Sequence, residues 1–283
     1  MHDYLRAITL GIVQGITEFL PISSTAHLRI FPALMRWNDP GTAYSAVLQL
    51  GSLLAVVIYF WSDLLKIYGS LLRETILFIK KKSDSPLTSY DSKLAFWILL
   101  GTIPICIFGL LFKEPIETGV VRDLNIVAFY LIFFGVLLYI SDKIAKENRT
   151  LNGINALDVL LIGLAQSFAL IPGVSRAGVT LFAGLLLGFK RAQAARFSFL
   201  LSVPAVLLSG LFELGSLFSA IKLQGNAIGM ELLLGILFAG ISGYFSIDFL
   251  LKYLQTHRTH IFVVYRIMLG AFVLYLNYIG VVH

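Results

Sequence analysis

Long apolar runs without a charged residue alternate with polar loops over most of this 283-residue chain. A helix needs about 20 mostly apolar residues to cross the hydrocarbon core of a bilayer. Six segments reach or approach that length and are predicted membrane spans, at residues 43–62, 95–112, 124–141, 197–212, 232–247 and 267–282. The pattern therefore predicts an all-α, polytopic membrane protein with a single integral membrane domain, 1–283.

Two other apolar segments, 4–35 and 157–188, are each interrupted at a proline that has polar residues around it. The interrupting residues are Gln14, Glu18, Pro21, Ser23, Ser24, Thr25, His27 and Arg29 in the first segment and Gln166, Pro172, Ser175, Arg176 and Thr180 in the second. Irregular backbone at membrane depth is tolerated only where it is buried in protein or lines a water-filled cavity. We therefore expect each segment to form a re-entrant helical hairpin, two half-length helices joined at the break.

The loop charges predict how the spans are oriented. The loop after the first span is strongly basic, with Lys66, Arg73, Lys80, Lys81, Lys82 and Lys93. Because cytoplasmic loops collect lysine and arginine, we expect this loop inside and the next one, 113–123, outside. The later loops alternate in the same way, so hairpin 4–35 enters from outside and hairpin 157–188 from inside. Each hairpin precedes three spans, which predicts an inverted-topology repeat with halves 1–142 and 155–283.

Short sequence matches between the two halves support this repeat. Gly11-x-x-Gln14 recurs as Gly163-x-x-Gln166, Pro21-x-x-Ser24 recurs as Pro172-x-x-Ser175 with one residue fewer between the two motifs, and Ser45 to Gln49 aligns with Ser198 to Ser202. Chance similarity between glycine-rich membrane helices is the alternative. Proteins built from inverted repeats usually place their site near the membrane midplane, where the broken helices meet.

The amino-acid composition also indicates a membrane protein and excludes other classes of protein. Hydrophobic residues make up 58% of the chain and charged residues only 13%, whereas a soluble domain carries about 25% charged residues. The net charge of +6 follows from the basic inner loops, and no nucleic-acid-binding motif accompanies it, so we expect no nucleic-acid partner. The single cysteine, Cys106, excludes a disulfide scaffold and is expected to be a small packed side chain.

Glu18 is the most unusual residue of the first hairpin. Gln14 lies four residues earlier and therefore shares its helix face. An ionised carboxylate at membrane depth is costly, so Glu18 needs a partner or a function. It could hold a divalent cation, accept a proton, or pair with Arg176 in a structural ion pair between the hairpins.

Hydroxyl groups gather where the second half-helix of each hairpin is expected to begin. Ser23, Ser24 and Thr25 occupy this place in the first hairpin, and Ser175 and Arg176 occupy it in the second, with Thr180 one turn later. Helix N-termini, hydroxyls and an arginine together favour a phosphate or diphosphate ligand. Ordinary N-capping is the alternative, although capping needs only one hydroxyl per helix.

His27 follows Ser24 by three residues, close enough in the sequence for the imidazole to exchange a proton with the hydroxyl. A lone histidine is more often structural. Beside a serine and a glutamate in a membrane-buried site, we expect a functional role instead.

Two stretches resemble the undecaprenyl-diphosphate phosphatases, the bacitracin-resistance proteins. The first runs from Gln14 and Glu18 through Phe-Leu-Pro21-Ile-Ser23-Ser24-Thr25-Ala-His27, the second is Pro172-Gly-Val-Ser175-Arg176-Ala-Gly-Val-Thr180, and Gln49-Leu-Gly-Ser52 fits as well. The resemblance covers essentially the whole chain in length, order and hydropathy. It implies hydrolysis of undecaprenyl diphosphate to the monophosphate carrier lipid that peptidoglycan synthesis reuses, and thereby bacitracin resistance.

The resemblance also implies roles for single residues. Glu18 and Gln14 fall in the acidic motif linked to a divalent cation, Mg²⁺ or Ca²⁺; Ser24 is the nucleophile or a water-positioning hydroxyl, His27 its proton partner and Arg176 the phosphate clamp. The expected phosphate pocket is lined by Ser23, Thr25, Gln49, Ser175 and Thr180. Three positions depart from the family pattern: Gln14 replaces a common glutamate, Ala177 a serine and Ala26 a glycine. Gln14 cannot act as a base and is a weaker metal ligand than glutamate.

Other functions remain open on the residues alone. A carrier that flips a phosphorylated isoprenoid lipid without hydrolysis would also use an inverted repeat with a midplane anion site. The phosphatidic-acid phosphatase signature is excluded, because no histidine follows Ser175-Arg176 before His257. A purely structural membrane protein would not explain two sets of costly polar residues at helix breaks. An inverted repeat does not decide which face the site opens to; the resemblance implies a multi-pass protein of the bacterial plasma (inner) membrane, surrounded by bilayer lipid, with its site facing outside. A homodimer is compatible with the sequence.

Overall fold

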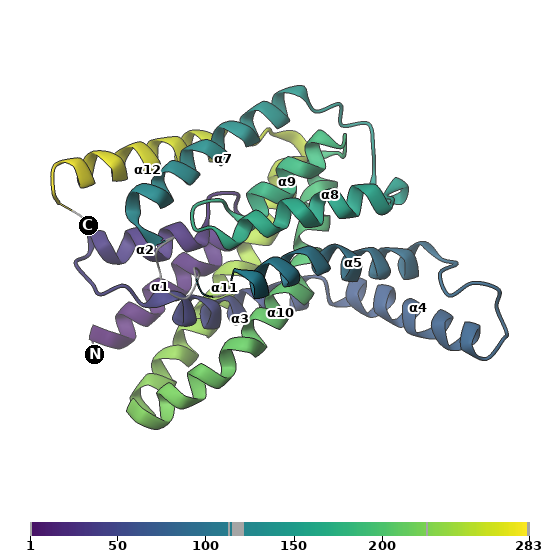
Figure 1. The fold of residues 1–283 in the computed structure, drawn as a ribbon, viewed down its shortest axis with the longest axis horizontal. Helices are drawn as coiled ribbons and strands as arrows, with labels where there is room; N and C mark the ends of the chain where they lie inside the picture. The colour runs from purple at the N-terminus through teal and green to yellow at the C-terminus, as the bar shows by residue number, and fades with distance from the viewer. Residues whose placement is uncertain (1, 113, 115–121, 225, 282–283) are drawn as a thin grey trace.

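The computed structural model describes residues 2–112, 114, 122–224 and 226–281, with the backbone alone for residues 2 and 212–228. The described residues are mostly helical (Figure 1). The elements are α1 (His2–Phe19), α2 (Ser24–Leu34), α3 (Gly41–Tyr59), α4 (Trp61–Ile79), α5 (Tyr90–Leu111), α7 (Leu124–Ile144), the 3-10 helix η2 (Leu151–Gly153), α8 (Ala156–Ser167), the 3-10 helix η3 (Phe168–Leu170), α9 (Arg176–Leu186), α10 (Arg191–Gln224), α11 (Asn226–Thr256) and α12 (His260–Tyr278). Most of the predicted outer loop 113–123 lies outside the described residues.

Six described helices are long and apolar enough to cross a membrane, which confirms the predicted spans in number. They are α3, α5, α7, α12 and the segments Arg191–Leu211 of α10 and Gly229–Thr256 of α11. Large apolar side chains on these helices point outward, for example Leu110 of α5 and Phe245 of α11. Extended apolar surface of this kind indicates contact with lipid.

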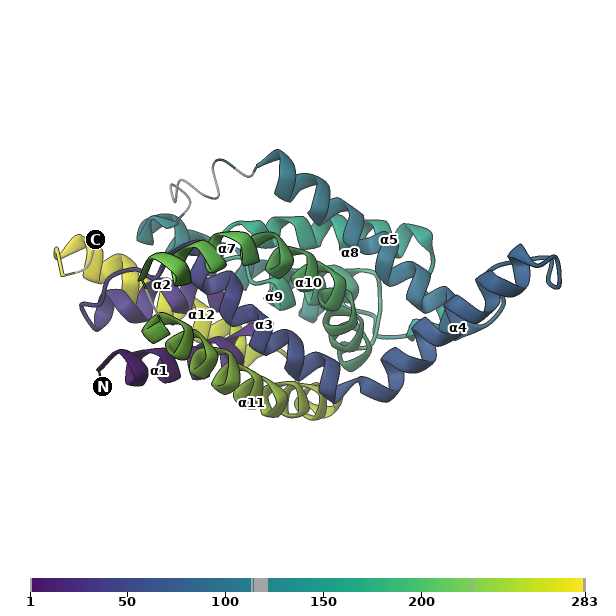
Figure 2. The ribbon, with the colours of Figure 1, turned by 90° about the horizontal axis from the view of Figure 1, so that it is seen from below.

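Helix α4 was not predicted from the sequence. It occupies the strongly basic loop, whose lysines and arginine interrupt any apolar run long enough for a span. In Figures 1 and 2, α4 and the beginning of α5 extend beyond the other helices at one end of the molecule. The buried Glu74 closes the α4–α5 connection by accepting hydrogen bonds from Thr88 N at 2.7 Å and Ser92 Oγ at 2.7 Å.

The two broken segments enter the molecule from opposite ends, and their breaks meet near its middle (Figure 1). α2 begins at Ser24 and α9 begins at Arg176. The preceding serine caps each helix: Ser23 Oγ accepts from Ala26 N at 3.4 Å, and Ser175 Oγ accepts from Gly178 N at 3.1 Å. Both capping serines have positive φ, 74° and 71°, a conformation that few side chains adopt.

The capping serines correct the alignment of the two breaks. Three pairs of residues share one spacing of 152: Gly11 with Gly163, Gln14 with Gln166, and Ser23 with Ser175. At this spacing Ser24 corresponds to Arg176, so the Pro-x-x-Ser comparison that matched Ser24 with Ser175 was wrong. The two prolines occupy different positions in the two loops, which is why they misled the comparison.

Glycines allow each hairpin to pack closely on a distant span. A Cβ atom added at Gly11 of α1 would overlap the carbonyl oxygen of Gly235 in α11, and one added at Gly163 of α8 would overlap that of Gly101 in α5. Small residues let membrane helices approach closely. Corresponding glycines of the two hairpins therefore make corresponding contacts, and each contact fixes the position of the break in its own hairpin.

Replacing Gly163 by alanine should destabilise the fold. The added methyl group would collide with backbone, which cannot move aside as a flexible side chain can, so we expect a loss of about 1–3 kcal/mol in the free energy of unfolding. Thermal unfolding in detergent measures the loss. Gly153→Ala is the matched control, because a Cβ atom there meets no atom within 4 Å. Equal stability of the two variants would contradict the proposed packing constraint.

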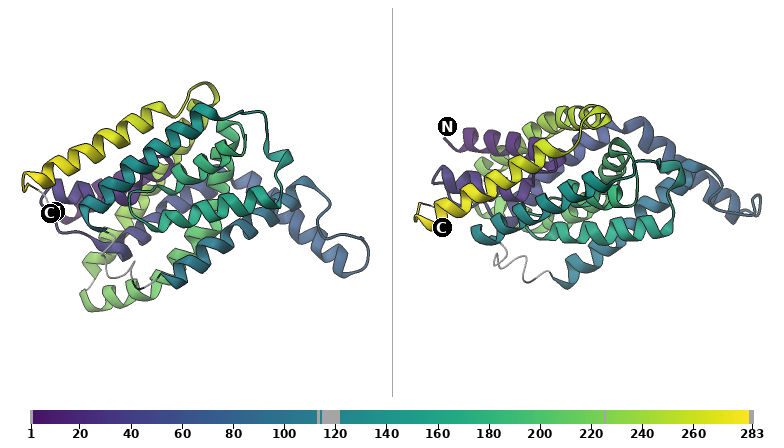
Figure 3. Two further views of the ribbon diagram at one scale, coloured as in Figure 1. Left: turned by 45° about the horizontal axis from the view of Figure 1, so that its top comes forward. Right: turned by 90° about the horizontal axis from the view of Figure 1, so that it is seen from above.

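α7 and α12 lie side by side and antiparallel (Figures 1 and 3). At one end of the pair, the backbone N–H and the hydroxyl of Thr259 each donate to the buried carboxylate of Asp142 at 2.7 Å. At the other end, Asn277 Nδ2 donates to Asn125 Oδ1 at 2.7 Å. This pairing fixes the middle of α12 near both breaks.

Candidate active site

A cavity of about 490 Å³ lies where the two breaks meet. Its polar wall comes from both breaks and from α3: Glu18, Ser23, Ser24, Thr25, Thr42, Ser45, Gln49, Ser175 and Arg176. Much of the remaining wall is apolar and comes from α5 and α10, with Ile105, Cys106, Leu110, Ala205, Val206 and Leu208. Leu110 and Leu208 line the cavity and are well exposed, from which we infer that the cavity opens between α5 and α10.

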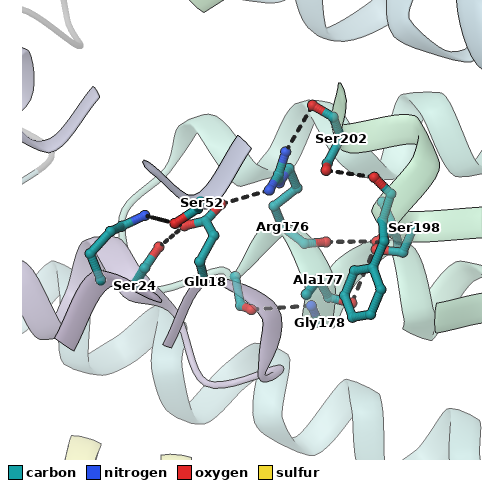
Figure 4. Close-up of polar contacts among 12 residues, drawn as sticks. Glu18, Ser24, Ser52, Arg176, Ala177, Gly178, Ser198 and Ser202 are labelled. Carbon is teal, nitrogen blue, oxygen red and sulfur yellow. Dashed lines mark hydrogen bonds and ion pairs between the residues drawn. The ribbon is translucent and has the colours of Figure 1, made fainter. Parts of the chain in front are cut away.

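Glu18 is the centre of the polar contacts in this cavity (Figure 4). Its Oε1 accepts a charged hydrogen bond from Arg176 Nη2 at 2.6 Å. Its Oε2 accepts from the hydroxyl of Ser24 and from Gln14 Nε2, the latter at 2.9 Å. The carboxylate is buried, and its partners come from both hairpins. Of the three options for Glu18, the structure realises the ion pair with Arg176, and it also directs the hydroxyl of Ser24 at the carboxylate as a hydrogen-bond donor.

Arg176 brings a positive charge from the second hairpin to the first. Besides the ion pair with Glu18, its Nη1 donates to the carbonyl oxygen of Ser202 in α10 at 3.3 Å (Figure 4). A guanidinium has five N–H donors in a planar fork. Since Arg176 lines the cavity, donors of this fork remain within reach of an anion there.

Both helix N-termini contribute to the same cavity, because Ser24 and Arg176 line it. The first N–H groups of a helix have no partner within the helix. At the cavity these are the N–H groups of Ser24 and Thr25 in α2 and of Arg176 and Ala177 in α9. Together with the helix dipoles they form a region that attracts negative charge.

Gln14 and Glu18 contain the oxygens that could hold a divalent cation. Gln14 Oε1 is buried and has no hydrogen-bond partner, while Gln14 Nε2 also approaches Ser52 Oγ at 3.4 Å. No group of three His, Cys, Asp or Glu residues that could hold a metal occurs among the described residues. Magnesium commonly binds through one or two carboxylates plus substrate phosphates and waters. Glu18 and nearby hydroxyls line the cavity and fit such an ion when phosphate oxygens complete its ligands. Gln14 does not line the cavity and turns Nε2 toward Glu18, so its Oε1 would join them only after the amide turns over.

A second arginine lines the cavity at its rim. Arg122 donates to Asp39 through Nη2 at 2.5 Å and through Nε at 3.0 Å. Burial has the largest single influence and disfavours the charged form of Asp39, but the hydrogen bonds from Arg122 and from the N–H of Gly41, together with the charges of Arg122 and Arg29, outweigh it and lower the pKa of the carboxyl group. The pair joins the loop before α3 to the start of α7. The sequence pattern does not distinguish Arg122 as a site residue, because it belongs to a polar loop in which an arginine is ordinary.

Three predicted site residues, Gln14, His27 and Thr180, do not line the cavity wall. The Nδ1–H of His27 donates to the carbonyl oxygen of Ser23 at 2.7 Å, and the Nε2 of the neutral ring accepts from the hydroxyl of Tyr265 at 2.6 Å. The structure thus pairs the Ser24 hydroxyl with Glu18 rather than with His27. The Thr180 hydroxyl is buried against Ser198 Oγ at 2.5 Å.

The sequence reading missed Arg266, which is completely buried behind the breaks. Its guanidinium donates to backbone carbonyl oxygens of both breaks and of α7. The sequence does contain an indication of its role: an arginine directly before an apolar run of 16 residues, 267–282, is a candidate functional residue. The predicted last span, 267–282, begins directly after this arginine and does not include it.

These features define a class: an all-α membrane protein with a cavity between two broken segments, lined by two helix N-termini, an arginine and a glutamate. The chain belongs to the bacitracin resistance protein BacA family, whose model matches residues 7–272. It is similar to proteins named undecaprenyl-diphosphatase over nearly its whole length. Three of them come from Chloroherpeton thalassium (44% identity, covering 96% of each chain), Gloeobacter violaceus (48%, covering 95% of this chain and 90% of the relative) and Pelodictyon phaeoclathratiforme (47%, covering 98% of each).

Proposed function

We propose that the protein hydrolyses undecaprenyl diphosphate to undecaprenyl phosphate and inorganic phosphate, the activity by which its relatives are named. One observation carries this proposal: two helix N-termini, Arg176 and the Glu18–Ser24 pair line one cavity that also has an apolar wall. The reaction returns the carrier lipid to peptidoglycan synthesis. The description of the family refers to bacitracin resistance.

The cavity suits both parts of such a substrate. The terminal phosphate binds among the free N–H groups of Ser24 and Thr25, the N–H groups that begin α9, and the guanidinium of Arg176. Ser23, Ser175 and Gln49 line the same polar wall. The isoprenoid chain leaves through the apolar opening between α5 and α10 and continues into the lipid.

Substrate binding activates Glu18. When the phosphate shares the donors of Arg176, the carboxylate of Glu18 loses part of its stabilising partner and becomes a stronger base. Glu18 already accepts the hydrogen of the Ser24 hydroxyl, so it is positioned to take that proton as an oxygen attacks phosphorus. Arg176 and the helix N–H groups then stabilise the charge on the equatorial oxygens, which is the main catalytic contribution in phosphoryl transfer.

Two routes use these residues. In the first, Ser24 Oγ forms a bond to the terminal phosphorus, the bond to the bridging oxygen breaks, and undecaprenyl phosphate leaves with that electron pair; water then hydrolyses the phosphoserine. In the second, Ser24 orients a water that attacks directly. Acid quenching of a single turnover with labelled terminal phosphate separates them, because only the first route leaves label on Ser24.

A divalent cation, Mg²⁺ or Ca²⁺, would be held by Glu18 and Gln14. When bound, it would neutralise part of the charge of the diphosphate. The unpartnered Gln14 Oε1 supports this assignment. Removal of the metal by EDTA should then lower the rate of phosphate release.

His27 takes a positioning role in this proposal. Its two ring nitrogens join the carbonyl of Ser23 to the hydroxyl of Tyr265, so the imidazole supports the loop that carries Ser24 from behind. Thr180 supports the first turn of α9 in a similar way, since its hydroxyl donates to the carbonyl of Arg176 at 2.8 Å.

We propose that the six spans and two re-entrant hairpins form an inverted-topology repeat in the bacterial plasma membrane, with the cavity facing outside. The basic loop around α4 would then be cytoplasmic. The matching capping serines, the matching glycine contacts and the entry of the hairpins from opposite ends support this arrangement.

Cys106 offers a direct test of the side of access, because this sole cysteine lines the cavity. A membrane-impermeant maleimide added to the outside of right-side-out vesicles should modify Cys106 and block phosphate release. Cys106→Ser should remain active and resist the reagent. Modification only in inverted vesicles would show that the cavity opens to the cytoplasmic side.

A further inference from the structure

Arg266 is a buried cation without a carboxylate partner among the described residues. Its side chain has no exposed surface, although it lies in the second turn of the membrane span α12. All its hydrogen bonds go to backbone carbonyl oxygens: Leu131, Pro21, Tyr130, Gly173 and Val174, at distances from 2.9 to 3.4 Å. A buried charge is tolerated only when such partners satisfy it, so these contacts must be retained for the fold to hold the guanidinium.

The carbonyls that Arg266 binds belong to the two breaks. Pro21 lies in the loop before α2, and Gly173 and Val174 lie in the loop before α9. Tyr130 and Leu131 belong to α7, the neighbouring span. One side chain therefore joins the loops of both hairpins to the α7–α12 pair.

The surrounding backbone leaves room for the guanidinium. A Cβ atom at Gly178 would lie 2.8 Å from Arg266 Nη1, and one at Gly135 would lie 3.5 Å from Arg266 Cβ. Gly173 has φ of +98°, and a Cβ atom there would approach the carbonyl oxygen of Val127 at 2.5 Å. The second break and α7 thus approach each other closely enough for one arginine to span them.

We propose that Arg266 is a positioning residue for phosphate hydrolysis, acting through the backbone of both breaks. In a trans peptide the C=O and the following N–H point in opposite directions. Binding the carbonyl of Val174 therefore directs the N–H of Ser175 away from Arg266, and Ser175 lines the cavity. Arg266 holds the carbonyl end of this peptide on the far side, so the N–H of Ser175 turns toward the cavity. The N–H groups of Ile22 and Val174 instead bond within their own loops, to Leu20 O at 2.7 Å and Ile171 O at 3.3 Å, so at Pro21 and Gly173 Arg266 fixes the shape of the loop.

Tyr265 adds a contact from the same turn of α12. Its hydroxyl lies 2.6 Å from His27 Nε2, and the two rings are stacked with centroids 5.6 Å apart. His27 in turn holds the carbonyl of Ser23. Adjacent residues of α12 thereby fix the first break at two points.

This inference rests on the proposed function, and the experiment separates the two. Purified wild type, Arg266→Gln, Arg266→Lys and Arg149→Gln are compared for kcat and KM with undecaprenyl diphosphate, inhibition by orthovanadate, and thermal unfolding. Arg149 is the matched control: it also donates to carbonyl oxygens, of Leu187 and Gly153, but does not line the cavity. A wild type that releases no phosphate would refute the proposed function.

For Arg266→Gln we expect kcat per folded molecule to fall about 100-fold with little change in KM. Misplaced hydrogen-bond donors lose more of their stabilisation of the transition state than of their binding to the substrate. Inhibition by orthovanadate, which resembles the transition state, should weaken in parallel. Arg266→Lys, which keeps the charge but reaches fewer carbonyls, should lose about tenfold. Arg149→Gln should lower the unfolding temperature alone.

A purely structural Arg266 would give a different result. Both glutamine variants would then lower the unfolding temperature and leave kcat and vanadate inhibition per folded molecule within about twofold of wild type, which would overturn the proposal. If Arg266→Gln does not fold, Arg266→Lys decides: reduced kcat with an unchanged unfolding temperature supports positioning, and unchanged kcat overturns it.

Discussion

Replacing Arg176 by glutamine should lower kcat for phosphate release by about 10³-fold, the scale on which a transition-state arginine contributes to phosphoryl transfer. Arg176, the first residue of α9, provides a side-chain positive charge that lines the cavity, and its planar fork can hold two phosphate oxygens. Arg176→Lys keeps the charge but loses the fork and should recover only part of the rate. The measurement is steady-state phosphate release with undecaprenyl diphosphate.

The same substitution should destabilise the protein, because it leaves the buried carboxylate of Glu18 without its cationic partner. Breaking a buried ion pair costs about 3–5 kcal/mol. Arg196→Gln is the control, since Arg196 pairs with the partly exposed Asp63 away from the cavity. Wild-type activity in a folded Arg176→Gln variant would remove Arg176 from the mechanism.

Glu18→Gln is the second substitution with a large expected effect. It removes the proton acceptor of Ser24 and the only carboxylate that could hold a cation with Gln14 among the described residues. General-base catalysis contributes about 10²–10⁴-fold, so we expect kcat to fall by about 10³-fold. Rates are compared over a range of Mg²⁺ and Ca²⁺ concentrations, because loss of a ligand alone would be partly reversed by excess metal.

The double variant Glu18→Gln with Arg176→Gln separates the contribution of this ion pair to catalysis from its contribution to stability. Neither charge is then left unpaired, so the unfolding free energy should recover relative to either single variant, while activity stays absent. Recovery of activity together with stability would mean that the pair serves the fold alone.

Much of the fold was predictable because the bilayer imposes strict rules on sequence. The length of apolar runs gave the six spans, and prolines with polar residues gave the two breaks. Helix α4 escaped prediction because hydropathy detects spans and says little about amphipathic helices in basic loops. Two prolines one residue out of register also misaligned the breaks, whereas the capping serines matched.

The polar residues of the cavity were predictable in type, since a glutamate, three hydroxyls and an arginine at helix breaks are costly without a function. Their partners were not predictable. Sequence spacing placed His27 beside Ser24, but the capping geometry of Ser23 turns the imidazole toward Tyr265, which is 238 residues away. Cys106 was expected to be a packed side chain, and its place on the cavity wall depends on how α5 crosses α10.

The most direct test of the account is phosphate release by the purified protein from undecaprenyl diphosphate, with and without EDTA, beside Ser24→Ala. The account predicts release by wild type, a marked loss with EDTA that added Mg²⁺ or Ca²⁺ restores, and at least a 100-fold loss in Ser24→Ala. Folded wild-type protein that releases no phosphate, yet moves a phosphorylated isoprenoid lipid across liposomes, would contradict hydrolysis and identify a carrier.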